Sequence, residues 1–315
     1  MRLDELKERL LAALPKGSVL SGEPLRLHTT FRIGGPADLY IRPGDEKELA
    51  GAVRVCREAG MPYFILGNGS NVLASDLGYR GAVIEIGRAL GDIRVEGERI
   101  FAGAGASLAA IAKEALSASL DGLAFAAGIP GTLGGACVMN AGAYGGEMKD
   151  VLESVRLLLP DGTLCSMSPE ELHFGYRATD IGALGAIVTG AVFKLKPGDA
   201  GKIRARMEEL REKRQARQPL DVPSAGSTFK RPKGDYAGRL IEASGLRGYA
   251  VGEAMVSAKH CGFVVNRGKA SSSDVAAVIA HVRKTVLDDS GILLEPEVRF
   301  LGEFAEVGIC PSPET

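Results

Sequence analysis

The hydrophobic positions in the first two thirds of the chain alternate between helical and strand spacing. Leucines recur every three or four residues between positions 3 and 14, with acidic residues among them. We therefore predict an amphipathic first helix rather than a targeting segment. Short apolar runs bounded by glycine, proline or polar residues predict buried strands over 62–66, 81–86 and 186–195.

An apolar stripe over 45–60 predicts a second helix. Asp45 is placed to cap this helix, and Glu48, three residues later, is placed to complete a capping box. Gly60 is placed to end it. Three further patterns lie in the same region: a hairpin over 93–103 that turns near Gly97, a helix over 107–119 with Ser107 at its start, and two strands over 154–159 and 163–167 around the turn Pro160-Asp161-Gly162.

The pattern changes near residue 198, where we place a domain boundary. A highly charged helix is predicted over 202–220, ending at Pro219. Beyond it, helices over 234–246 and 273–289 alternate with strands over 262–266 and 293–302, and Val275, Val278, Val282 and Val286 share one helix face. We predict a larger region of two lobes over 1–197 (lobe boundary near 85–105), a helical connector over 198–219, a smaller α+β domain over 220–303 and a loose tail over 304–315.

Composition adds little chemistry but excludes several classes of protein. The 315 residues are 45% hydrophobic and 24% charged, with a formal net charge of −1, which is typical of a soluble protein and disfavours nucleic acid as a partner. The five cysteines are far apart and never form C-x-x-C, so we expect neither a disulfide framework nor a metal site. The uncharged stretch 122–146 contains eight glycines, Pro130 and Asn140, and therefore suits a ligand-binding loop better than a membrane helix.

Three glycine clusters are candidates for a phosphate-binding loop: 67–71, 103–107 and 128–135. A nucleotide-triphosphate P-loop is excluded, because Ala270 follows the only suggestive Gly-Lys pair. The dinucleotide fingerprint also fails, since Val72 occupies its third glycine position in the first cluster. The second cluster lies between a strand and a helix, so a degenerate phosphate turn there stays open. Together the clusters favour an extended ligand with a pyrophosphate.

Six motifs occur in an order that identifies a family. They are HTTFRIGGPADLY (28–40), LGNGSNVLASD (66–76), GIPGTLGGACVMNAGAYG (128–145), FGYR (174–177), SAGSTFKRP (224–232) and LEPEVRFLG (294–302). With these motifs the chain resembles the UDP-N-acetylenolpyruvoylglucosamine reductases, flavoenzymes of peptidoglycan precursor synthesis. The resemblance implies an α+β fold, with a two-lobed FAD-binding domain of the vanillyl-alcohol-oxidase type and a smaller α+β substrate domain.

The resemblance also implies which residues bind FAD. The loop Gly67, Asn68, Gly69, Ser70 and Asn71 is expected to hold the pyrophosphate through main-chain N–H groups. No histidine lies between His28 and His173, so the flavin is expected to be bound non-covalently. The rest of the cofactor is expected to contact Ile129, Pro130, Gly131, Gly134, Gly135, Val138 and Gly142.

The family reaction implies three catalytic residues. NADPH reduces FAD, and the flavin then delivers hydride to an enolpyruvyl ether of UDP-N-acetylglucosamine. By resemblance, Arg177 and Glu297 stabilise the enediolate-like intermediate and Ser227 protonates it. Glu295 stays a lesser candidate for the carboxylate, and Lys230 or water is expected to polarise Ser227.

Substrate contacts are expected from Tyr176, Lys230, Arg231 and His260, with Arg214 and Arg217 as further candidates for the UDP diphosphate. Two departures from the family pattern concern the segment after FGYR. The insertion that carries a lid tyrosine in the longer form of the family is missing, and Thr179 replaces a usual serine. We expect a cytoplasmic monomer that binds neither nucleic acid nor membranes. Two alternatives stay open: a flavin oxidase on the same fold, and a non-catalytic nucleotide-binding module.

Overall fold

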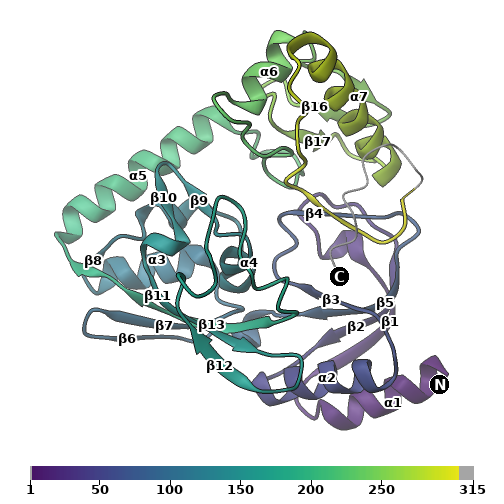
Figure 1. The fold of residues 1–315 in the computed structure, drawn as a ribbon, viewed down its shortest axis with the longest axis vertical. Coiled ribbons are helices and arrows are strands. Elements are labelled where there is room, and N and C mark those ends of the chain that lie inside the picture. Colours follow the sequence, from purple (N-terminus) through teal and green to yellow (C-terminus); the bar gives the residue numbers. More distant parts are fainter. Residues whose placement is uncertain (1, 305–315) are drawn as a thin grey trace.

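The computed structural model describes residues 2–304, which form three bodies around a common centre (Figure 1). The first lobe packs two helices, α1 and α2, against a four-stranded sheet in the order β1-β2-β5-β3. Strands β2, β5 and β3 are parallel, and β1 is antiparallel to β2. The elements are α1 (Leu3–Ala13), β1 (Ser18–Pro24), β2 (Pro36–Arg42), α2 (Glu46–Glu58), β3 (Tyr63–Leu66) and β5 (Tyr79–Glu85).

Two of the three residues predicted to begin or end α2 act as expected, and the third does not. The side chain of Asp45 accepts a hydrogen bond from the main-chain N of Glu48 over 3.0 Å, and Gly60 follows the helix with φ of 65°. The predicted capping box is wrong, however. The Glu48 carboxylate accepts from the main-chain N of Lys16 and of Gly44 instead, because these two unpaired donors lie beside it.

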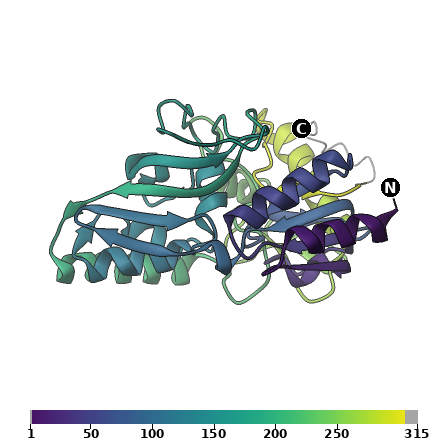
Figure 2. The ribbon, with the colours of Figure 1, turned by 90° about the horizontal axis from the view of Figure 1, so that it is seen from below.

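The second lobe is a five-stranded antiparallel sheet in the order β12-β11-β13-β7-β6, and it lies beside the first lobe (Figure 2). The predicted hairpin is confirmed, with Gly97 at φ 57° between its strands. Ser107 caps the following helix by accepting from the main-chain N of Ala110. The elements are β6 (Ile93–Glu96), β7 (Arg99–Gly103), α3 (Leu108–Ser117), β11 (Leu152–Leu158), β12 (Leu164–Met167) and β13 (Ile187–Lys194).

The charged helix α5 (Ala200–Arg217) runs along one side of the molecule to the C-terminal domain (Figure 1). There, two helices pack on the antiparallel sheet β15-β16-β17, and the four predicted valines of α7 are fully buried. None of the helices within residues 2–304 is long and apolar enough to cross a membrane. The elements are α6 (Ala237–Ala243), β15 (Ala250–Val251), β16 (Ala254–Val256), β17 (Val264–Asn266) and α7 (Ser272–Ser290).

The end of the described chain returns to the first lobe. β18 (Arg299–Leu301) pairs in parallel with β4 (Val72–Ala74), which directly follows the first glycine cluster. The strand predicted over 293–302 is therefore wrong in extent, because Pro296 has no N–H for a ladder and forms only a single bridge to Phe229. The predicted tail lies outside the described residues except at its first position.

Short elements complete the two lobes. They are α4 (Leu133–Val138), the pairs β8 (Leu120–Asp121) with β14 (Lys196–Pro197) and β9 (Gly142–Ala143) with β10 (Gly146–Glu147), and the 3-10 helices η1 (Leu25–Leu27), η2 (Arg88–Leu90), η3 (Ala124–Gly128) and η4 (Met148–Asp150).

Candidate active site

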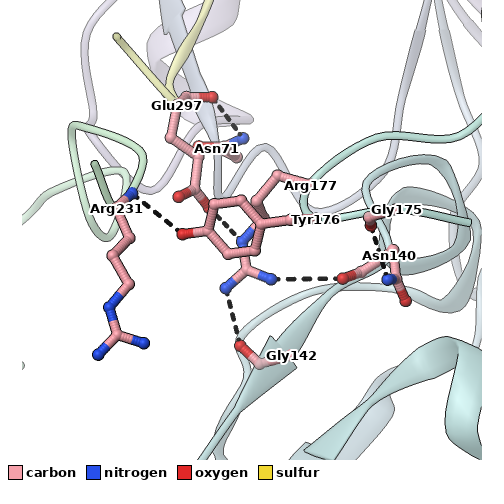
Figure 3. Close-up of polar contacts among 8 residues, drawn as sticks. All are labelled: Asn71, Asn140, Gly142, Gly175, Tyr176, Arg177, Arg231 and Glu297. Atoms are coloured by element: carbon pink, nitrogen blue, oxygen red, sulfur yellow. Dashed lines mark hydrogen bonds and ion pairs between the residues drawn. The ribbon is translucent and has the colours of Figure 1, made fainter. Parts of the chain in front are cut away.

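An arginine and a glutamate from distant parts of the chain form a partly buried ion pair. The Nε of Arg177, which lies between β12 and β13, donates to Oε1 of Glu297 over 3.0 Å (Figure 3). Only 17% of the Arg177 side chain and 12% of the Glu297 side chain are exposed. Burial raises the pKa of Glu297, although the charges of Arg177 and Lys230 act in the opposite direction. Its carboxyl group is thus biased toward the protonated form, which can donate a hydrogen bond.

The Arg177 guanidinium is held on two further sides by main-chain oxygens. Nη1 donates to the carbonyl oxygen of Asn140 over 3.3 Å, and Nη2 donates to that of Gly142 over 2.9 Å (Figure 3). With the ion pair, these bonds use three of the five N–H groups of a guanidinium. The other two have no acceptor among residues 2–304. They are available for an anionic ligand group such as a carboxylate.

The main chain at Arg177 is strained. Its φ of 53° lies in the left-handed region, which residues other than glycine rarely adopt. The main-chain N of Gly175 donates to the carbonyl oxygen of Ala178 over 2.9 Å and closes a tight turn around Tyr176 and Arg177. A strained residue that also presents a charge is typical of a functional site.

Ser227 belongs to a segment that pairs with the Glu297 segment. The main-chain N of Glu297 donates to the carbonyl oxygen of Thr228 over 2.8 Å, and Thr228 is buried. Ser227 directly precedes Thr228, and its own side chain is exposed. The structure therefore brings Arg177 and Glu297 together, and it places Ser227 in the segment that pairs with the Glu297 segment.

The second carboxylate considered from the sequence faces away from Arg177. The Glu295 side chain is 67% exposed and forms an ion pair with Lys230. Lys230 thus donates to Glu295 rather than to the Ser227 hydroxyl. Of the two glutamates, Glu297 is the one that meets the guanidinium.

Tyr176 and Arg231 connect the second lobe with the C-terminal domain. The main-chain N of Arg231 donates to the Tyr176 hydroxyl over 3.0 Å, and the Tyr176 ring centroid lies 5.2 Å from Cζ of Arg177 (Figure 3). Several cationic side chains face one cavity here, which suits a phosphate-bearing ligand. This cavity, of about 380 Å³, is lined by Lys230, Arg231, Pro232, Lys233, Ile292, Leu293 and Glu295.

His260 is occupied within its own domain. Its Nδ1 accepts from the main-chain N of Gly262 over 3.1 Å, and its ring meets the Phe263 ring edge-on. Burial lowers the pKa of His260, which favours the neutral imidazole. Its contacts within residues 2–304 do not include the Arg177–Glu297 pair, so the structure does not bring His260 to that pair.

The first glycine cluster, Gly67 to Asn71, presents unpaired main-chain donors. None of its five N–H groups donates to an acceptor within residues 2–304, and a cavity of about 270 Å³ adjoins Gly67 and Asn68. Gly69 has φ of 59°, and a Cβ there would lie 2.1 Å from the carbonyl oxygen of His28. Only glycine fits this position. Successive free N–H groups form an anion-binding nest, as the sequence predicts for this loop.

The second glycine cluster differs, because the main-chain donors of its first four residues are already used. The main-chain N of Ala104 donates to Thr189, that of Gly105 to Leu90 and that of Ala106 to Gly103. The open alternative of a phosphate turn at 103–107 is therefore wrong. This cluster instead supports the third one through main-chain bonds between Ala104 and Gly134 and between Ala106 and Leu133.

The third cluster lies against the first. The Asn68 side chain donates to the carbonyl oxygen of Pro130 over 2.7 Å, and Arg214 of α5 donates to that of Gly128. A Cβ at Gly135 would meet no protein atom within 4 Å, so a ligand can approach the main chain there. The Thr179 hydroxyl donates to the carbonyl oxygen of Val138 over 2.8 Å, which joins this segment to the Arg177 turn.

Sequence reasoning did not select Asn140 as a site residue. It is fully buried, has φ of 42° and contacts the Arg177 turn. The available signal was an asparagine two residues after the end of a short helix, where asparagine tolerates the left-handed region. The partners of its side chain depend on the tertiary fold.

Comparison with known proteins agrees with this organisation. Two family models match the chain: "FAD binding domain" over residues 37–168 and "UDP-N-acetylenolpyruvoylglucosamine reductase, C-terminal domain" over residues 218–301. The reductases of that name from Agathobacter rectalis and Caldanaerobacter subterraneus are 50% and 48% identical to it over 303 and 301 residues. These matches cover 92% and 96% of this chain and 96% and 98% of the relatives.

The crystal structure of the reductase from Thermus caldophilus is similar to the whole fold. It is 37% identical with a TM-score of 0.78, covering 91% of this chain and 99% of that one. The predicted α+β fold, a two-lobed domain of the FAD-binding type with a smaller domain after it, is confirmed. The chain belongs to the UDP-N-acetylenolpyruvoylglucosamine reductase family.

Proposed function

We propose that this protein reduces UDP-N-acetylglucosamine enolpyruvate to UDP-N-acetylmuramate with NADPH, in the synthesis of peptidoglycan precursors. The family membership supports this reaction. The observation that carries it is the partly buried pair of Arg177 and Glu297, whose guanidinium keeps two N–H groups for an anion. The same guanidinium is bonded to Gly142, in the segment expected to contact the cofactor.

The residues present fit non-covalent FAD. Gly67 to Asn71 offer unpaired N–H groups to the pyrophosphate, and the open face at Gly135 admits a flat ligand close to the main chain. Bound FAD would supply a carrier that takes hydride from NADPH and passes it to the vinyl carbon of the substrate. The remaining cofactor contacts are assigned to Ile129, Pro130, Gly131, Gly134, Val138 and Gly142.

The catalytic residues stabilise charge and deliver a proton. Arg177 binds the substrate carboxylate with its two remaining N–H groups and stabilises the negative charge that develops there. Burial raises the pKa of Glu297, and in its protonated form this carboxyl group donates a second hydrogen bond to the same group. Ser227 gives a proton to the adjacent carbon.

The diphosphate of the substrate is assigned to the cavity beside the site. Lys230 and Arg231 line this cavity and supply positive charge, and Tyr176 contacts the main chain of Arg231. His260, engaged in its own domain, is assigned a contact with the substrate outside the ion pair. We infer that the protein acts in the cytoplasm, because both NADPH and the nucleotide substrate are highly charged and do not cross membranes. We also propose that it is a monomer. Size-exclusion chromatography of the purified protein checks the oligomeric state.

An anaerobic two-step experiment tests the function. The protein, purified with its flavin, is reduced with NADPH and then mixed either with the enolpyruvyl substrate or with air. Fast reoxidation by the substrate and slow reoxidation by air is the expected result. Fast reoxidation by oxygen alone would identify a flavin oxidase, and a colourless protein that binds no flavin would identify a binding module.

A further inference from the structure

Asn140 is buried at the junction of three segments, and every hydrogen-bonding atom of its side chain is used. Its Nδ2 donates to the carbonyl oxygen of Gly175 over 2.8 Å and to Oε2 of Glu147 over 2.9 Å. Its Oδ1 accepts from the main-chain N of Lys149 over 3.1 Å. The side chain is thus oriented by three partners and cannot rotate without breaking them.

The same residue contacts the Arg177 turn at its first residue and at the Arg177 side chain. Gly175 opens the turn and is held by the Asn140 amide, and the Arg177 guanidinium is held by the Asn140 carbonyl oxygen over 3.3 Å (Figure 3). The main chain at Arg177 is strained, at φ 53°. A strained turn persists only where its surroundings fix it, and Asn140 supplies two of these contacts.

We propose that Asn140 is a positioning residue for the reduction: it holds the strained turn so that the Arg177 guanidinium meets the substrate carboxylate. This inference rests on the proposed function. Asn140 touches neither the reacting carbon nor the flavin in this scheme and acts through Arg177.

Replacing Asn140 with aspartate tests this role, because Asn140→Asp keeps the shape of the side chain and removes both N–H donors. A carboxylate at this place faces the carbonyl oxygen of Gly175 and the carboxylate of Glu147, which repel it. The turn is then released while Arg177 itself is unchanged. Asn140→Gly is the second variant, since glycine accepts φ of 42° and lacks the amide altogether.

Both variants are expected to retain FAD and to be reduced by NADPH at the wild-type rate. Reoxidation by the enolpyruvyl substrate is expected to slow by about 10²-fold, the cost of a small misplacement of a catalytic group. The dissociation constant of the substrate, measured by calorimetry on the oxidised protein without NADPH, is expected to rise as well. This binding measurement does not depend on turnover.

Two controls separate positioning from general destabilisation. Asn266 is also a buried asparagine whose side chain makes three hydrogen bonds. Its partners are Phe31 and, in the C-terminal domain, Gly268 and Ala270, so none belongs to the Arg177 turn. Asn266→Asp is expected to lower the melting temperature without slowing reoxidation selectively. In an Arg177→Lys protein, adding Asn140→Asp is expected to cause little further loss, because the two residues act as one unit.

The outcomes are distinguishable. If the wild-type protein is reoxidised by substrate and Asn140→Asp or Asn140→Gly keeps that rate and the substrate affinity, the positioning role is overturned and the function is retained. Equal slowing by Asn266→Asp, or fully additive losses with Arg177→Lys, also overturns it. A wild-type protein that the substrate does not reoxidise would overturn the proposed function and this inference with it.

Discussion

Arg177 and Glu297 lie 120 residues apart in the sequence, yet the Nε of one is 3.0 Å from Oε1 of the other. The arginine comes from a turn of the second lobe, and the glutamate from the segment that leads into β18. Neither region alone contains the pair. The candidate site therefore forms only when the C-terminal domain is docked on the FAD-binding domain.

Replacing the proposed proton donor should affect only one half of the reaction. We expect Ser227→Ala to be reduced by NADPH at nearly the wild-type rate, because no proton is needed from Ser227 in that step. Reoxidation by substrate should slow by about 10²–10⁴-fold, the usual contribution of general acid catalysis. Stopped-flow absorbance of the flavin measures both steps, and an equal loss in the two would exclude the proton-donor role.

The raised pKa of Glu297 predicts a pH dependence. Burial keeps this carboxyl group protonated to a higher pH than an ordinary glutamate, so its hydrogen-bond donor is present below the raised pKa and is lost as the pH rises through it. The rate of reoxidation by substrate should fall over the same range. Glu297→Gln cannot ionise and should be slower but lack this fall.

Glu295→Gln is the comparison for that experiment, because Glu295 is exposed and two residues away. It should keep the wild-type fall in rate at high pH. If Glu297→Gln turns over normally and Glu295→Gln does not, the catalytic carboxylate is Glu295.

The cofactor loop offers a matched pair of glycine substitutions. Gly69 and Gly97 have nearly the same φ, 59° and 57°, but a Cβ at Gly69 would overlap the carbonyl oxygen of His28, whereas one at Gly97 meets nothing within 4 Å. Both alanine variants should lose roughly 1–2 kcal/mol of stability from backbone strain. Only Gly69→Ala should lose flavin, measured as the ratio of flavin to protein absorbance. Loss of flavin in both would point to general unfolding.

A hydrogen-bonded contact between the loop after β4 and the start of α7 should contribute measurably to stability. Ser272 is buried. Its hydroxyl donates to Oδ2 of Asp76 over 2.8 Å and accepts from the main-chain N of Asp76 over 3.0 Å. Ser272→Ala leaves the main-chain N of Asp76 unpaired, while Oδ2 of Asp76 keeps only its bond from the main-chain N of Ser272. The free energy of unfolding should fall by about 1–3 kcal/mol in urea titrations. Ser273→Ala, at the exposed neighbouring position, should change it by less than about 0.5 kcal/mol. Equal effects would show that the contact is worth little.

The sequence predicted helix ends and turns correctly where they depend on residues close to one another in the chain. Asp45 and Ser107 cap their helices through their own side chains, and Gly97 turns its hairpin, because each acts on residues three or four positions away. Glu48 failed as a capping-box residue because a non-local donor, the main-chain N of Lys16, competes for its carboxylate. The pairing of β4 with β18 has no local signal at all.

In the candidate site, too, the sequence predicted what local motifs specify but not what depends on distant parts of the chain. The family motifs selected Arg177 and Glu297, and the structure brings these two together. The glycine pattern alone could not separate the loop at Gly67 to Asn71 from the cluster at 103–107, because both are rich in glycine. The difference lies in which N–H groups are already bonded, and this depends on distant carbonyl groups such as that of Thr189.

The return of β18 to β4 has a consequence for dissecting the protein. The Asn71 side chain donates to the main-chain carbonyl oxygen of Glu297. The main-chain carbonyl oxygen of Asn71 accepts from the main-chain N of Arg299. A fragment cut after α5 would contain every residue assigned to the flavin, but it would expose an unpaired strand edge directly behind the pyrophosphate loop. Such a fragment should not hold flavin until the complementary piece is added back, so the two halves are better studied as a reconstituted pair than as separate modules.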